Sequence, residues 1–276
     1  MNASKPQDVI VCTPKMLPRK RWVAAARNAA AINPVNHAPI ERLALAIKGF
    51  APKPQHLAVV TTKYWRSAGV KLTVGFLDNP PADLRARILL HMNAWSKTAN
   101  VAFVETKTDP QVRIARQAGD GYWSYVGTDL LIIDKSEPTM NLDSFTMKTP
   151  ESEFHRVVRH ETGHTMGFPH EHMRRQLVDR IDVAKAIDYF KRTQGWDANM
   201  VRMQVLTAIE ESSLLGTPDA DPNSIMCYQL PGAITKDGKP IVGGLDIDQS
   251  DYDFAAKIYP KPTKPPPAAG GKKVKG

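Results

Sequence analysis

The chain has 276 residues, which is enough for one large domain or two small ones with a buried core. Its composition, 42% hydrophobic and 24% charged, is that of an ordinary globular protein. No apolar run approaches the roughly 20 residues that span a bilayer, so we expect no membrane insertion. Cys12 and Cys227 are the only cysteines, which excludes a disulfide framework.

The formal net charge of +9 is concentrated at the two ends of the chain. Residues 1–50 carry a net +6 and residues 260–276 a net +5, which leaves −2 for the rest. A nucleic-acid binder needs a basic stripe on its folded surface. We therefore expect basic ends in solvent and no nucleic-acid partner.

Three regions follow one another along the sequence. Residues 1–56 form an N-terminal extension, which suits a prosegment, a packing arm or a partner-binding extension. Residues 57–259 form the predicted main domain, and residues 260–276 a Pro/Lys-rich tail that we expect to be disordered. The first ten residues lack the apolar stretch of a secretory signal, so we expect a cytoplasmic protein or export by another route.

Apolar periodicity predicts the elements in chain order. Helices are expected at Trp22–Ile32 and Ile40–Ile47, and after Asn79-Pro80-Pro81, where Leu84, Ile88, Met92 and Trp95 share one face. Strands are expected at Val70–Phe76, Val101–Glu105, Val112–Ala115 and Asp129–Ile133. Later helices are expected at Val183–Phe190 with Asp182 as cap, Ala198–Leu206 and Asp251–Ile258. This order predicts an α+β fold, with helices packed against one twisted sheet.

Five of the eight histidines fall between His155 and His172. Thr149-Pro150-Glu151 has the pattern of a helix start, with a capping hydroxyl, a proline and an acid. On that helix His160 and His164 are four residues apart, so both imidazoles project from one side and suit a single Zn²⁺. Glu161 lies about 100° round the helix from His160, where it can flank the metal without binding it.

A third ligand requires the helix to stop. On a continued helix His170 would face about 240° away from His164. Gly167 can adopt the left-handed conformation that ends a helix, and Pro169 cannot continue one. The chain can then fold back and bring His170 to the same ion, while we expect His155 and His172 to stay outside the ligand set.

Three segments resemble a known family. HETGHTMGFPHE (His160–Glu171) resembles the extended zinc signature of the metzincin metallopeptidases, and its ending resembles the astacin branch. Ser224–Tyr228 (SIMCY) is similar to the astacin Met-turn, and Gly119–Gly127 (GDGYWSYVG) to the segment that enters the strand above the astacin cleft. The resemblance implies a metzincin-like fold, with a twisted mixed sheet, an active-site helix above the cleft and an irregular, partly helical C-terminal subdomain.

The same resemblance implies the chemistry. One catalytic Zn²⁺ would be held by the three histidines, and Met226 would form a hydrophobic floor beneath them. Glu161 would be the general base, and Tyr228 a fifth ligand at rest that donates a hydrogen bond to the oxyanion. Independently of the resemblance, an extended protein or peptide substrate would add to a sheet edge through backbone hydrogen bonds. Leu130–Ile133 are the candidate edge, and they suit a plain core strand equally well.

Some features depart from the astacin pattern and leave alternatives open. The chain lacks the cysteines of the two astacin disulfides, and no aspartate latch is recognisable before residue 64. Cys12 is either a thiolate latch on the zinc or an incidental thiol. Glu171 either contacts an amino terminus made by prosegment removal or forms a surface ion pair.

The sequence therefore predicts a zinc-dependent endopeptidase, which we expect to be a monomer. A non-catalytic zinc-binding protein is the first alternative, and it requires a fourth protein ligand that closes the site. A basic-tailed interaction module that binds acidic polymers is the second, and its binding would survive loss of the histidines.

Overall fold

The computed structural model describes residue 12 and residues 15–36, 62–170, 175–207, 221–227 and 229–262. The predicted helix Ile40–Ile47 and nearly all of the predicted tail lie outside these ranges. Every helix in the described part is too short or too polar to cross a lipid bilayer.

A five-stranded sheet forms the base of the molecule, with strand order β2-β1-β3-β5-β4. The strands are β1 (Val70–Phe76), β2 (Val101–Glu105), β3 (Val112–Ala115), β4 (Tyr122–Ser124) and β5 (Met140–Leu142). β1 pairs in parallel with β2 and β3, and β3 with β5, whereas β4 runs antiparallel to β5 and forms an edge of the sheet. The mixed sheet is as predicted, and β1, β2 and β3 have the predicted bounds.

The predicted strand Asp129–Ile133 is wrong, because Gly127–Ile132 form a 3₁₀ helix. Leu130 and Ile133 are buried while Leu131 between them is 42% exposed. Burial at every third residue is the period of a 3₁₀ helix and not of a strand. The expectation that a substrate pairs with Leu130–Ile133 therefore fails, since the free sheet edge on this side is β4.

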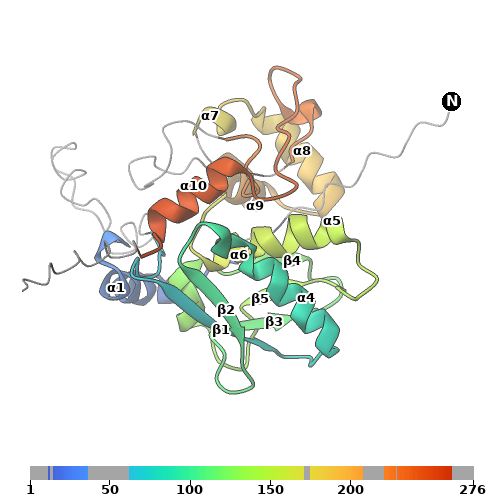
Figure 1. The fold of residues 1–276 in the computed structure, drawn as a ribbon. Helices are drawn as coiled ribbons and strands as arrows, with labels where there is room; N and C mark the ends of the chain where they lie inside the picture. Colours follow the sequence, from blue (N-terminus) through green and yellow to red (C-terminus); the bar gives the residue numbers. More distant parts are fainter. Residues whose placement is uncertain are drawn as a thin grey trace, which may run out of the picture.

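Two long helices pack on one face of the sheet (Figure 1). The first, α4 (Ala82–Met92), continues as a 3₁₀ turn, Asn93–Lys97, and buries the predicted face. The second consists of α5 (Glu151–Glu153), a π-helical turn (Phe154–Val158) and α6 (Arg159–Thr165). The predicted cap by Thr149 is absent, because its hydroxyl accepts from the Thr146 amide at 3.0 Å and Pro150 precedes the first turn.

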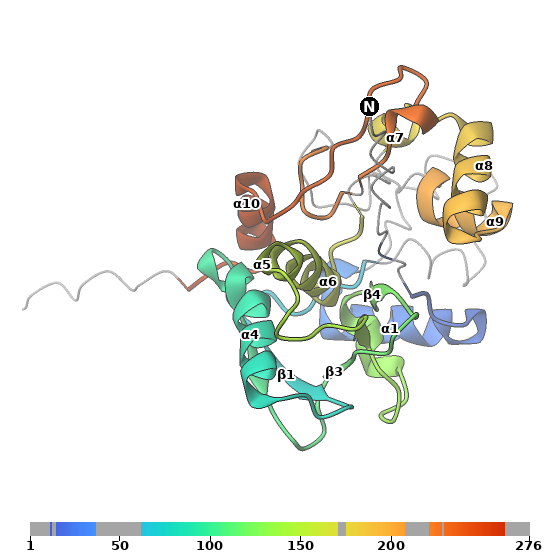
Figure 2. The same ribbon diagram turned by 90° about the vertical axis from the view of Figure 1, so that its right-hand side faces the viewer.

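The C-terminal half lies on the other side of α6 from the sheet (Figure 2). It contains α7 (Arg175–Val178), α8 (Val183–Gln194) and α9 (Ala198–Val201), which continues as a π-helical turn to Leu206. Asp182 caps α8 as predicted. The last helix, α10 (Gln249–Ile258), begins two residues before the predicted start, because Asp248 and Asp251 form a capping box.

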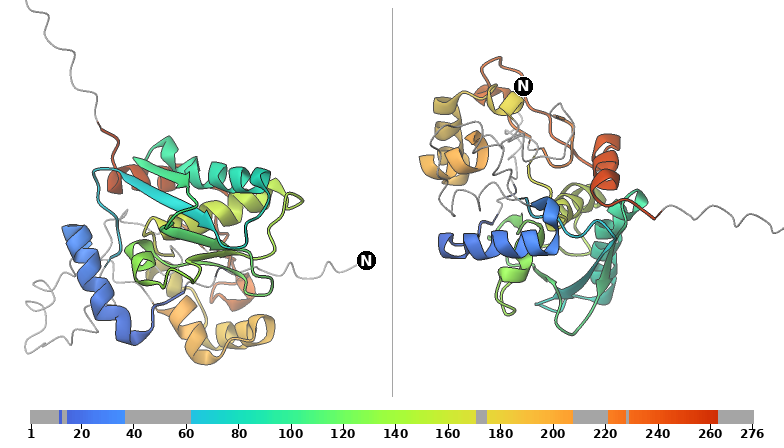
Figure 3. Two further views of the ribbon diagram at one scale, coloured as in Figure 1. Left: turned by 90° about the horizontal axis from the view of Figure 1, so that it is seen from below. Right: turned by 90° about the vertical axis from the view of Figure 1, so that its left-hand side faces the viewer.

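The described part of the N-terminal extension packs on the body as an arm, which we define as residue 12 and residues 15–36. Its helix α1 (Trp22–Ile32) has the predicted bounds and lies against the 3₁₀ helix Gly127–Ile132, far from α4 (Figure 3). The buried Asn36 side chain bonds the backbone C=O and N–H of Tyr64 at 2.7 and 2.9 Å. These contacts fix the end of the arm to the start of the main domain.

Asp251 joins α10 to the segment Ser224–Cys227. One carboxylate oxygen accepts from the Ser224 hydroxyl at 2.6 Å, and the other accepts from the Ile225 amide at 2.9 Å. The side chain is buried, which raises the pKa of Asp251 to about 7. The conformation of Ser224–Cys227 thus depends on one buried carboxyl group.

We predict that Asp251→Ala lowers the free energy of unfolding by about 2–4 kcal/mol, because two buried donors lose their acceptor. Denaturant unfolding monitored by tryptophan fluorescence measures this loss. Asp253→Ala, on the exposed side of the same helix, is the control and should change stability by less than about 0.5 kcal/mol. Equal effects of both substitutions would contradict the anchoring role of Asp251.

Candidate metal centre

The helix that carries the HExxH residues ends as predicted. Gly167 has φ +100°, its N–H donates to His164 C=O at 2.8 Å, and the Phe168 N–H donates to Gly163 C=O at 3.0 Å. This pair of bonds is the Schellman arrangement that closes a helix. The chain then reverses, and His170 returns to the side of α6 that carries the other two histidines.

Three ring nitrogens converge at this turn. Nε2 of His170 lies 3.1 Å from Nε2 of His160 and 2.9 Å from Nε2 of His164. All three side chains are buried. Since zinc–nitrogen bonds are about 2.0–2.1 Å, tetrahedral zinc places its ligand atoms about 3.3 Å apart. The three predicted ligands therefore lie together with nearly the spacing that zinc requires.

Backbone carbonyls set the tautomers of two of these histidines. Nδ1 of His160 lies 2.5 Å from Ile225 C=O, and Nδ1 of His164 lies 2.8 Å from Phe168 C=O. A carbonyl can only accept, so each Nδ1 carries the hydrogen and each Nε2 offers a lone pair. Burial lowers the pKa of His164 to about 4, which keeps it neutral. This donor set fits a zinc ion.

Glu161 lies on the same helix beside the converging imidazoles. The residue is 1% exposed, and burial raises the pKa of its carboxyl group to about 8. Within the described residues its Oε2 has no hydrogen-bond partner. A buried oxygen of this kind needs a water molecule or a ligand group as its partner.

Met226 packs against α6 between the two histidine turns. A Cβ at Gly163 would lie 2.4 Å from the Met226 sulfur, so any side chain at this position would displace Met226. Met226 is buried next to Ile225, whose carbonyl orients His160. Met226, which the resemblance placed beneath the histidines, thus packs directly on α6.

Cys12 of the arm also reaches the metal centre. Its Sγ and the ligand nitrogens of His160, His164 and His170 all lie within 4.8 Å of one another. The thiol hydrogen-bonds the Glu161 carboxyl group, and neither Cys12 nor Cys227 forms a disulfide. Four potential ligands, three from the body and one from the arm, therefore surround a single point.

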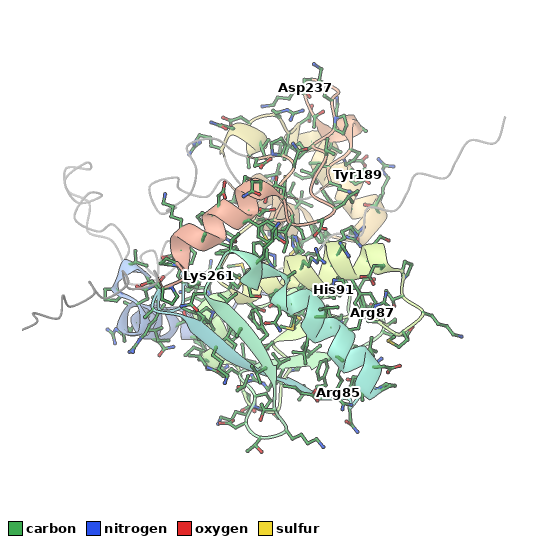
Figure 4. All side chains as sticks on the ribbon, viewed as in Figure 1. Arg85, Arg87, His91, Tyr189, Asp237 and Lys261 are labelled. Atoms are coloured by element: carbon green, nitrogen blue, oxygen red, sulfur yellow. The ribbon has the colours of Figure 1, made fainter. Side chains whose placement is uncertain are left out.

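His91, Glu151 and His155 form a second group of potential ligands in the described part of the chain. Two arginines already contact this group. Arg87 pairs with Glu151 at 2.5 Å, and Arg159 lies 3.3 Å from His91 Nδ1. Figure 4 shows Arg87 and His91 together on α4. Two cations so close oppose a further cation, so we interpret this group as an ion-pair network that ties α4 to the active-site helix.

The structure does not place every predicted site residue at the metal centre. Tyr228, Glu171 and His172 are outside the described residues. His155 is not near the three ligands, and its Nδ1 lies 2.8 Å from a carboxylate oxygen of Asp246. The role of the Ile225 carbonyl has no side-chain signal in the sequence, and Asp251 was expected only as the start of a helix.

Comparison with known proteins decides the family. A family model described as Astacin, a family of peptidases, matches residues 59–237. The chain belongs to the astacin family. The predicted α+β, metzincin-like fold is confirmed by a solved structure of myroilysin, which is similar with a TM-score of 0.68 and 28% identity over 73% of this chain and 97% of that one.

Two curated relatives match either a shorter part of this chain than myroilysin does or a similar part at lower identity. Zinc metalloproteinase nas-27 of Caenorhabditis elegans is 32% identical over 120 residues, which are 42% of this chain and 25% of that protein. Tolloid-like protein 2 of Homo sapiens is 26% identical over 237 residues, 79% of this chain and 21% of that protein. The chain spans about a quarter of the length of these relatives. Zinc metalloproteases of the astacin family use one catalytic zinc ion, as expected from the sequence, and the cluster of His160, His164 and His170 could bind it.

We predict that removal of zinc destabilises the protein. Ligand binding at 100 times its Kd adds about 2.7 kcal/mol to the free energy of unfolding, so chelation should lower the melting temperature by several degrees. One equivalent of Zn²⁺ should restore it, and His164→Ala should abolish the response. Thermal unfolding with metal analysis measures the effect, and an identical melting temperature with and without zinc would contradict it.

Proposed function

We propose that this astacin-family chain is an endopeptidase that hydrolyses peptide bonds in proteins or peptides, with Glu161 as its general base. The observation that carries the proposal is the convergence of three imidazoles beside a buried carboxyl group, one oxygen of which has no partner among the described residues. A structural zinc site does not need that carboxyl group.

The metal and the residues of this chain have different roles in the proposed hydrolysis. Zinc, when bound, supplies a Lewis acid that polarises the scissile carbonyl and lowers the pKa of water. Glu161 accepts a proton from the attacking water and passes it to the leaving amine, so no net proton is gained or lost. By resemblance to the family, we also propose that Tyr228 donates a hydrogen bond to the oxyanion.

We further propose that the full chain rests in a closed state, with the Cys12 thiolate as a fourth zinc ligand. The thiol proton passes to Glu161, whose carboxyl group has a raised pKa and accepts the hydrogen bond of that thiol. The fourth ligand thus comes from the N-terminal arm and not from the body. This separates the proposal from the non-catalytic alternative, in which the closing ligand is permanent.

We predict that Cys12→Ala raises the peptidase activity of the zinc-loaded full chain at least about tenfold, because the metal then has an open position. Cleavage of an unfolded protein such as casein measures this rise. Met16→Ala, at an exposed position of the same arm, is the control. A Cys12→Ala chain that holds zinc but is no more active than the unaltered chain would contradict the closed state.

We predict that Glu161→Gln, made in the Cys12→Ala chain, lowers kcat by about 10²–10⁴-fold, because the proton acceptor is lost. Zinc content should stay at one equivalent, since Glu161 is not a ligand. Glu153→Gln, on the same long helix, is the matched control. Full turnover in the Glu161→Gln chain would rule out its role as general base.

A further inference from the structure

The arm lies at the metal centre through Cys12, as part of a bound peptide would. The contacts of its side chains therefore indicate which groups the surrounding body residues can bind. This inference rests on the proposed peptidase function. Cys12 lies at the converging imidazoles, and Lys15 follows three residues later. The contacts of Lys15 therefore lie where a substrate side chain a few residues from the cut would also lie.

Lys15 meets an aromatic ring and a carboxylate together. Its Nζ lies 4.5 Å from the centroid of the Trp123 ring and 3.7 Å from Oδ1 of Asp120. Trp123 belongs to β4, the edge strand next to α6, and it is 4% exposed with the arm in place. An ammonium group over an indole face and beside a carboxylate is held by two attractions at once.

The two body residues are fixed without the help of Lys15. The Trp123 indole N–H donates to the other oxygen of Asp120 at 2.8 Å. The turn that carries Asp120 is held in place by Asp143, whose Oδ2 accepts from the amides of Gly119 and Gly121 at 2.8 and 2.9 Å. A binding site that is already ordered loses less entropy when its ligand arrives.

The pair with Lys15 contributes little to holding the arm. An ion pair of 3.7 Å whose side chains are 37% and 33% exposed stabilises a protein only weakly. Helix α1, Asn36 and the buried Leu17 already fasten the arm to the body. The geometry of Asp120 and Trp123 suits recognition of a cation better than it suits anchoring.

We infer that Asp120 and Trp123 form a substrate subsite for a basic side chain, lysine or arginine. In the closed chain Lys15 occupies this subsite. Once the arm leaves, a basic residue of the substrate takes its place, and the enzyme prefers peptides with lysine or arginine at one position a few residues from the scissile bond.

The first test measures this preference in the otherwise complete Cys12→Ala chain. Peptide pairs differ in one residue, lysine or the uncharged isostere norleucine, placed in turn at each of four positions on either side of the cut. At one position kcat/KM should favour lysine about five- to tenfold. Asp120→Asn should reduce that ratio to about two or less, while Asp253→Asn should leave the ratio unchanged. Equal rates for both peptides at every position would overturn the subsite.

The second test does not depend on turnover. In the zinc-loaded chain with Cys12 present, Lys15→Met and Asp120→Asn should each speed the alkylation of Cys12 by iodoacetamide about two- to fivefold. Peptide mapping by mass spectrometry separates Cys12 from Cys227. Combining both substitutions should give no further increase, because they remove one shared interaction.

The two tests separate the two proposals. Loss of all peptidase activity in the zinc-loaded Cys12→Ala chain would overturn the proposed function, while the alkylation rates would still decide whether Asp120 binds Lys15. Additive effects of Lys15→Met and Asp120→Asn, or no effect of either, would overturn the subsite even in an active enzyme.

Discussion

The metal centre depends on the abrupt end of α6 at Gly167. Two histidines on adjacent helical turns offer two ligands, and a third can reach the same ion only if the chain reverses within a few residues. The left-handed conformation at Gly167, φ +100°, makes this reversal. The same turn exposes the Phe168 carbonyl, which orients His164, so one backbone conformation both delivers a ligand and sets the tautomer of another.

Residues of the C-terminal half orient the other histidine of α6, His160. The Ile225 carbonyl orients His160, Met226 packs on Gly163, and Asp251 of α10 holds the Ile225 amide. Helix α6, which carries two of the ligands, thus lies between the sheet that supports it and the segment Ser224–Cys227, which orients His160. Such outer hydrogen bonds hold metal-ligating imidazoles in the tautomer and ring orientation that coordination needs. The arm contacts both halves, because Cys12 packs in the apolar cluster of the C-terminal half and Leu17 packs with Ile133.

Much of this arrangement was predictable, because it follows from local patterns. Alternation in Val70–Phe76, the helical face of α4 and the His160–His164 spacing each depend on a few neighbouring residues. Leu130–Ile133 was predicted wrongly because a short apolar run suits a strand or a tight helix equally well. The three-residue strand β4 left too short a pattern to detect.

Other features depend on contacts between distant parts of the chain. Nothing in the sequence around Cys12 places its thiol beside His160, which is 148 positions away in the printed numbering. The same holds for Lys15 and Asp120, whose meeting depends on how the arm crosses β4. The sequence left Cys12 open as a thiolate latch or an incidental thiol, and nothing in it indicated the contact between Lys15 and Asp120.

X-ray absorption at the zinc edge of the full chain counts the atoms around the metal and so decides whether Cys12 is a ligand. We expect three nitrogen neighbours at about 2.0–2.1 Å and one sulfur at about 2.3 Å, with the sulfur lost in Cys12→Ala. A first shell without sulfur in the unaltered chain, or one with fewer than three imidazoles, would contradict this expectation.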